Sequence, residues 1–194
     1  MSRAARQLPP PLWQRLGALG DALVGRRSVR RFSSDGISDE DLSLLLASAG
    51  GITDPVRGLR SAPSGGACYP LEIYLVSKHG VEQYVPERNS LIPAKGADVR
   101  ADLARHSYNQ SFLADAPVTV AICAEYPRIT GRYGRRGIRY AILEAGHVAQ
   151  NLHLAAQALG YGSVAVGAYD DEGVKEALGV AGDVLYLIPV GRPR

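Results

Sequence analysis

A chain of 194 residues is the size of one domain, since domains run to roughly 100–200 residues. Its composition, 46% hydrophobic and 21% charged, is that of a globular protein and excludes a disordered or collagen-like chain. The formal net charge is +3. We predict a single domain over residues 1–194, with residues 1–11 forming a flexible N-terminal arm.

The sequence predicts a cytoplasmic protein that is not inserted in a membrane. Residues 1–6 lack the apolar core of a signal peptide. Residues 145–169 contain no acidic or basic side chain, but glutamines, histidines and glycines interrupt them, which favours a buried helix and strand over a membrane span. Cys68 and Cys123 form no CxxC pair and no disulfide framework, as is typical of a reducing cytosol.

The hydrophobic pattern predicts helices and strands interspersed along the chain. Apolar spacing predicts an amphipathic helix over residues 12–24, and Ser38, followed by three acids, predicts the start of a second helix that ends at Gly50. The next elements are a loop over residues 52–68, a strand over 71–76, a hairpin over 81–94 that turns near 87–89, a helix over 97–106, and a central strand over 117–124.

A long helix is predicted over residues 138–159. Small and apolar residues occupy more than one of its faces, so we expect it to be buried, in part against another subunit. A strand over 163–168, a helix over 170–178 and a strand over 184–190 complete the chain. This interspersed order places the fold in the α/β or α+β class.

Several common catalytic motifs are absent. There is no GxxxxGK[ST], HExxH or GxSxG. The run from Gly160 to Ala165 resembles a dinucleotide fingerprint, but it follows a helix and opens a strand, the reverse of the required order. Glu144, His147 and Asn151 share one helix face, yet a metal site needs more ligands; we interpret them as hydrogen-bonded polar residues and predict no metal.

The basic residues are unusual in type and position. Of 22 basic residues, all but three are arginine, and they cluster within residues 26–31 and 128–139. The arginine side chain grips phosphate in a bidentate manner, so a phosphorylated ligand, small or polymeric, is the first hypothesis. Solvated surface charge is the alternative, and a nucleic-acid-binding module is a further one, disfavoured because no recognisable reading motif accompanies the arginines.

Glycine-containing tracts supply backbone that a flat ligand can approach closely. Residues 63–66 read Pro-Ser-Gly-Gly, and glycine leaves no Cβ in the way. Gly167 and Ala168 offer backbone N–H groups at the end of a predicted strand, and residues 191–194 close the chain with two more arginines.

These tracts, in this order, resemble the nitroreductase superfamily of flavoenzymes, and within it the SagB-type dehydrogenases. The resemblance covers residues 25–193 and is strongest at residues 26–30, 64–72 and 139–152. It implies an α+β fold: a mixed, mainly antiparallel central sheet flanked by helices, with the long helix at the interface of a homodimer that holds FMN. It further implies which residues bind the cofactor. The phosphate and ribityl chain would be held by Arg26, Arg27, Ser28, Arg30 and Arg192, and the ring's polar edge by Asn109. Gly167 and Ala168 would lie near the N5 atom, and the partner subunit would contribute Pro63, Ser64 and Gly65.

The resemblance also implies the chemistry. We expect ping-pong hydride transfer through FMN, with NAD(P)H as donor and a small-molecule acceptor such as a nitro compound or quinone. The SagB-type alternative is oxidation of peptide azolines to azoles, assisted by a Lys-Tyr pair; this chain has Arg132-Tyr133 there, and a guanidinium is a poor general base. Tyr133 is the candidate catalytic residue. A non-catalytic flavin sensor is the remaining alternative.

Overall fold

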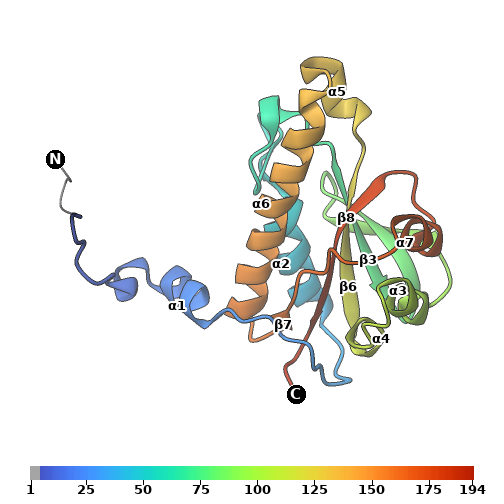
Figure 1. The fold of residues 1–194 in the computed structure, drawn as a ribbon, viewed down its shortest axis with the longest axis horizontal. Coiled ribbons are helices and arrows are strands. Elements are labelled where there is room, and N and C mark those ends of the chain that lie inside the picture. Colours follow the sequence, from blue (N-terminus) through green and yellow to red (C-terminus); the bar gives the residue numbers. More distant parts are fainter. Residues whose placement is uncertain (1–4) are drawn as a thin grey trace.

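A computed structural model describes residues 5–194, so the first four residues of the predicted N-terminal arm lie outside it. The elements, in chain order (Figure 1), are η1 (Trp13–Leu16), α1 (Ala18–Gly25), α2 (Asp39–Gly50), β1 (Ile52–Asp54), β2 (Leu59–Arg60), η2 (Gly65–Ala67), β3 (Leu71–Ser77), β4 (Gly80–Val85), β5 (Ser90–Lys95), α3 (Arg100–His106), α4 (Phe112–Asp115), β6 (Val118–Ala124), α5 (Pro127–Tyr133), α6 (Arg136–Ala158), β7 (Gly162–Ser163), α7 (Asp171–Leu178) and β8 (Asp183–Gly191).

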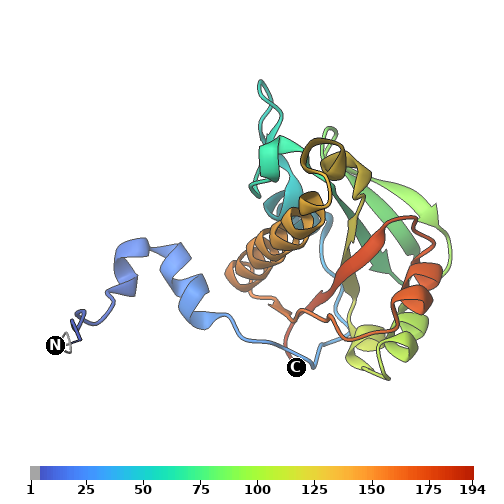
Figure 2. The ribbon, with the colours of Figure 1, turned by 45° about the horizontal axis from the view of Figure 1, so that its top comes forward.

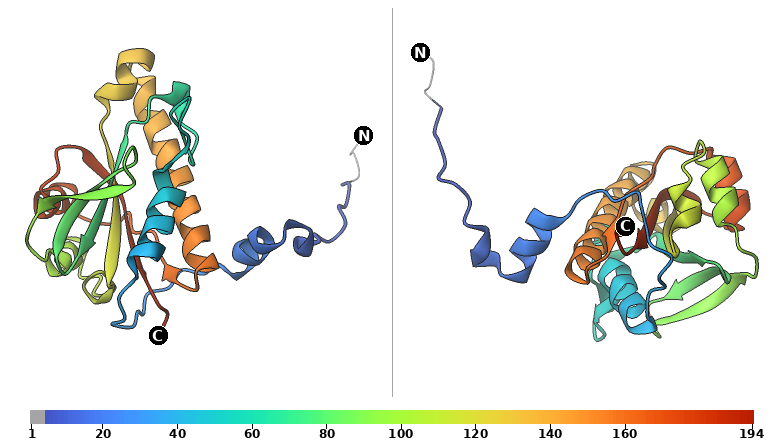
Figure 3. Two further views of the ribbon diagram at one scale, coloured as in Figure 1. Left: turned by 180° about the vertical axis from the view of Figure 1, so that it is seen from behind. Right: turned by 90° about the horizontal axis from the view of Figure 1, so that it is seen from below.

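A six-stranded sheet in the order β5-β4-β3-β6-β8-β7 forms the centre of the molecule, and its named strands pair antiparallel. Helices α2 and α6 cover one face of this sheet, while α3, α4 and α7 cover the other (Figures 1 and 3). Every residue of β6 is buried, which is why its sequence is apolar apart from Thr119. The predicted α+β fold is confirmed.

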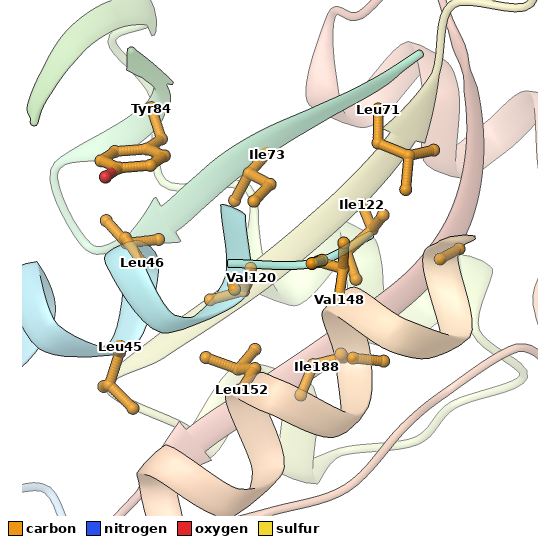
Figure 4. Packing of buried hydrophobic residues seen from close by; sticks show 14 of the residues in the cluster. Leu45, Leu46, Leu71, Ile73, Tyr84, Val120, Ile122, Val148, Leu152 and Ile188 are labelled. Carbon is orange, nitrogen blue, oxygen red and sulfur yellow. The ribbon is translucent and has the colours of Figure 1, made fainter. Parts of the chain in front are cut away.

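The larger core lies between the sheet and the helices α2 and α6 (Figure 4). Leu46 from α2 and Leu152 from α6 pack against the strand residues Ile73, Ile122 and Ile188. This packing buries one face of α6, and the other face stays open. The exposed face carries Ile142 and Leu143, each 53% exposed. The predicted long helix is therefore confirmed, with one apolar strip left without cover in the single chain.

Two predicted elements differ from the structure. The helix predicted over residues 12–24 is divided into η1 and α1 at Gly17, whose φ of 55° lies in the region that favours glycine. The strand predicted over 163–168 pairs only at β7, and Val166 rejoins β8 as an isolated bridge to Leu187. The hairpin over 81–94 is confirmed as β4 and β5.

Three short features were not predicted: the β1–β2 hairpin inside the expected loop, and the helices α4 and α5. Helices α4 and α5 have 4 and 7 residues, too few for a 3.6-residue period to stand out. Helix α5 begins with Pro127 at its first turn, a position that suits proline's fixed φ. Within residues 5–194, no helix combines the length and apolar character needed to cross a membrane.

Candidate functional site

The basic segment that follows α1 lies along the edge of the sheet, where Ser28 forms an isolated bridge with Ser163 and Phe32 forms one with Pro193. The Val29 amide donates to the Ser163 carbonyl of β7 at 3.0 Å, and the Arg194 amide donates to the Arg31 carbonyl at 3.1 Å. The segment therefore lies between β7 and the C-terminal residues. Its backbone is fixed on both sides, so its side chains project from a defined support.

Arginine side chains from this segment and from the C-terminal residue gather at one cleft. The cleft has a volume of about 720 Å³, and its polar lining residues are Arg30, Arg31, Ser33, Ser34, Asp115 and Arg194. Three guanidinium groups beside two hydroxyls form a donor set suited to a phosphate dianion. Arg30 was predicted here. Arg31 and Arg194 were not assigned to the site; the closing Gly-Arg-Pro-Arg run was the only signal for Arg194.

The other predicted arginines lie around this cleft rather than in its lining. Arg27 donates from Nη1 to the Val24 carbonyl at 2.7 Å and to the Arg26 carbonyl at 2.9 Å, so its side chain caps the end of α1. The Arg192 guanidinium lies over the Tyr161 ring, 5.0 Å from its centroid. These contacts fix both arginines beside the cleft.

A buried histidine supports the strand on which the segment is anchored. His153 of α6 lies 2.7 Å from the Ser163 hydroxyl through its Nδ1 atom. Burial, reinforced by the charge of Arg26, lowers the pKa of His153 to about 4. The ring is therefore neutral at neutral pH. This residue was not predicted, because a histidine in the part of a helix that lacks Asp, Glu, Lys and Arg carries no signal of its partner.

The predicted N–H donors lie along the same sheet edge. Gly167 and Ala168 are exposed, and within residues 5–194 neither amide donates a backbone hydrogen bond. Gln110 donates from Nε2 to the Ala168 carbonyl at 3.1 Å, which brings the turn containing Asn109 beside them. Tyr108 and Asn109 have φ values of 55° and 59°, a left-handed turn that asparagine tolerates.

The loop at Pro63–Tyr69 has an unusual backbone. Gly66, Ala67 and Tyr69 all have positive φ, at 60°, 53° and 46°, and such strain concentrates at ligand-binding segments. The Ser64 hydroxyl accepts a hydrogen bond from the Tyr69 amide at 2.9 Å and closes the loop. Pro63 is exposed, and Ser64 and Gly65 are half-buried. These three residues are the ones predicted to come from the partner subunit.

Beneath this loop lies a buried acid. Glu144 of α6 is 4% exposed, and its Oε2 atom has no hydrogen-bond partner among the described residues. Burial raises the pKa of Glu144 to about 7, against the opposing effects of the Ser64 hydroxyl and the Arg60 charge. Of its predicted companions, Asn151 donates to the Ser61 carbonyl at 3.3 Å. His147 is exposed in the single chain, so its expected hydrogen bond stays a prediction.

Replacing Glu144 by glutamine is expected to flatten the pH dependence of stability between pH 5 and 7. A carboxyl whose folded pKa exceeds its unfolded value stabilises the fold below the unfolded pKa, and this contribution is lost as pH rises through the folded pKa. For a shift from 4.5 to about 7 the loss is on the order of 3 kcal/mol. Urea unfolding at pH 5 and 7, at one protein concentration, measures it. The same decline in both proteins would contradict the assignment.

The two parts of the site lie at opposite ends of α6 (Figures 1 and 2). At one end Gly25 packs against Gln157, and a Cβ on Gly25 would lie 2.9 Å from the Gln157 Nε2 atom. At the other end a Cβ on Gly65 would lie 3.5 Å from the Tyr140 ring. A helical rise of about 1.5 Å per residue puts about 25 Å between Tyr140 and Gln157. In one chain the arginine cleft and the Pro63–Tyr69 loop are therefore separate.

Comparison with known proteins defines the class. A model of the nitroreductase family matches residues 23–192. A protein of Methanocaldococcus jannaschii named as a nitroreductase is 44% identical over 180 residues, which cover 90% of each chain. The microcin-processing protein McbC of Escherichia coli is 27% identical over 153 residues, 73% of this chain and 56% of that protein.

Solved structures agree with this class. A Ralstonia eutropha structure named as a nitroreductase has a TM-score of 0.84 at 23% identity and covers 100% of this chain and 88% of that one. The NADPH:FMN oxidoreductase of Vibrio harveyi, solved with NAD+, has a TM-score of 0.70 at 21% identity over 91% and 69% of the two chains. The fold and the matches define an oxidoreductase. The chain belongs to the nitroreductase family, a family of FMN-dependent enzymes.

Proposed function

We propose that two copies of this chain hold FMN between them and reduce a nitro compound or quinone with NAD(P)H as hydride donor. The observation that carries this proposal is that the arginine cleft and the Pro63–Tyr69 loop lie near opposite ends of α6 in one chain. Each part has the chemistry of a flavin site, and a second copy is needed to bring them together. The cysteine usage of the chain supports action in the cytoplasm.

The open face of α6 supports pairing of two copies. Ile138, Ile142 and Leu143 are exposed there, and Gly146 has open space beyond it. Apolar side chains of this size gain about 1.5–3 kcal/mol each on full burial. A two-fold axis across α6 sets the two helices antiparallel, so that the loop of one copy meets the arginine cleft of the other.

The residues present fit FMN. In this proposal Arg30, with Ser28, Arg26 and Arg192 beside it, binds the phosphate and ribityl chain, and the free amides of Gly167 and Ala168 donate toward the flavin N5 atom. Asn109 contacts the polar edge of the flavin ring. The face of the ring is covered by residues of the second copy, which are Pro63, Ser64 and Gly65. Bound FMN supplies hydride transfer at N5, with donor and acceptor using one pocket in turn.

Tyr133 is the chain's own candidate for a proton donor. Its hydroxyl lies against the loop, because a Cβ on Gly66 would be 2.4 Å from it. A tyrosine hydroxyl is a hydrogen-bond and proton donor, so Tyr133 is suited to donate a proton to a reduced acceptor. This supports the reductase direction over azoline oxidation, which needs a base.

The similarity to McbC favours azoline oxidation as the second candidate function. The two candidates are separated by anaerobic titration of the purified protein. The reductase proposal predicts that NADH or NADPH bleaches the flavin absorption and that a nitro compound or quinone restores it. Bleaching by an azoline peptide, with no response to either nicotinamide, would replace the first function by the second. FMN binding stands in both cases.

A further inference from the structure

We propose that Arg132 is a positioning residue that latches the Pro63–Tyr69 loop in its ligand-ready conformation. The inference rests on the proposed function, in which this loop faces the flavin held by the second copy. Arg132 donates from Nη1 to the Gly66 carbonyl at 3.1 Å. This hydrogen bond joins the last turn of α5 to the tip of the loop.

Helix α5, which carries Arg132, packs closely against the rest of the protein. Ile129, on the buried side of α5, is fully buried, and Gly137 of α6 approaches its backbone so closely that a Cβ would lie 3.0 Å away. Gly134 ends α5 with a φ of 55°. The packing of α5 against α6 therefore holds the backbone of Arg132 in place, and the Arg132 side chain extends from there to the loop.

The loop needs an external contact to keep its shape. Three of its residues have positive φ, and a non-glycine residue held there costs of order 1–3 kcal/mol. Inside the loop, the Ala67 amide donates to the Ser64 carbonyl at 3.1 Å and the Cys68 amide to the Gly65 carbonyl at 3.2 Å. These bonds fix the turn itself. Two further bonds join the loop to the body of the protein: the Arg60 amide donates to the Tyr69 hydroxyl at 3.0 Å, and Arg132 donates to the Gly66 carbonyl at the loop tip.

Close packing at Gly66 leaves little room for another arrangement. A Cβ on Gly66 would lie 2.9 Å from Arg132 Nη1 and 2.4 Å from the Tyr133 hydroxyl. The Tyr133 ring meets the Tyr140 ring edge-on, with centroids 5.1 Å apart and planes at 84°, a favourable aromatic geometry. The loop tip thus sits against a surface made by adjacent residues of α5, and Arg132 closes that surface with a hydrogen bond.

The chemistry of arginine suits this role. A guanidinium stays protonated at any working pH and offers only donors, so Arg132 holds a carbonyl but takes no proton from a substrate. A lysine offers donors as well and should hold the same carbonyl, though as a point charge without the planar fork. Lysine at position 132 should therefore keep the loop in place, whereas an uncharged side chain there should not.

The test compares amide hydrogen exchange within residues 65–68 of the full-length apoprotein for three variants. Arg132→Gln weakens a charge-assisted bond, and exchange in the loop should be about five-fold faster than in the wild type. Arg132→Lys should restore near wild-type exchange. Arg135→Gln is the matched control, an exposed arginine close by in the chain that should leave the loop unchanged. Equal exchange in Arg132→Gln and wild type would overturn the latch.

The FMN-loaded protein then tests whether the latch acts at the flavin. Arg132→Gln should change the visible circular dichroism of the flavin and raise KM for the acceptor several-fold with a smaller change in kcat; Arg132→Lys should reverse both. Faster loop exchange with an unchanged flavin spectrum and unchanged KM would overturn the positioning role. The exchange measurement needs no flavin, so its failure is distinct from failure of the proposed function.

Discussion

Replacing Ile142 and Leu143 together by aspartate yields a folded monomer that retains no measurable FMN. Both side chains lie on the open face of α6, and each aspartate would place a charge in the middle of the interface that the account requires. A buried unpaired carboxylate costs several kcal/mol, more than the apolar contacts there supply. Sedimentation velocity reports the mass, and absorbance reports the bound flavin.

The control for this variant is Ile92→Asp. Ile92 is also an exposed isoleucine, but it lies on β5 at the far edge of the sheet, away from α6. This variant should stay dimeric and keep its FMN. A doubly substituted α6 variant that remains a flavin-loaded dimer would show that α6 does not form the interface. The far-ultraviolet circular dichroism spectra of both variants must match that of the wild type, because only folded variants test the interface.

Replacing Arg30 by alanine is expected to weaken FMN binding by about 10- to 100-fold, since hydrogen bonds to charged groups contribute roughly 1.5–3 kcal/mol. Arg30 lines the cleft together with Arg31 and Arg194, so two guanidinium groups remain and the loss is partial. Arg136→Ala is the control, because that guanidinium lies over the Tyr140 ring, 5.8 Å from its centroid, and does not line the arginine cleft.

Equilibrium dialysis of the apoprotein against FMN measures both dissociation constants at one salt concentration, since phosphate contacts weaken with ionic strength. Arg136→Ala should change the dissociation constant less than two-fold in this account. Comparable losses in the two variants would mean that the cleft beside β7 does not bind the phosphate.

Long, strongly patterned elements could be predicted from the sequence. The nearly continuous apolar run of β6 and the length of α6 each have one reasonable interpretation. The turn near Asn89 also predicts the β4–β5 hairpin. The strand expected over residues 163–168 was mostly wrong because its pairing depends on β8, whose register admits only β7 and the bridge at Val166. No local pattern contains that information.

The candidate site was predictable at the level of segments and less so at the level of side chains. Motif order marked the arginine segment and the Pro63–Gly65 tract, and both occupy positions suited to a ligand. It could not show that Arg27 caps α1, because that depends on where the helix ends. Nor could it show that Arg194 joins Arg30 at one cleft, because strand pairing across the whole chain brings them together.

The paired-copy flavin site is tested most directly by analytical ultracentrifugation of the purified protein with detection in the visible flavin band. We expect a yellow dimer in which flavin absorbance and protein sediment together, with one FMN per chain. A colourless monomer that takes up no added FMN would contradict it.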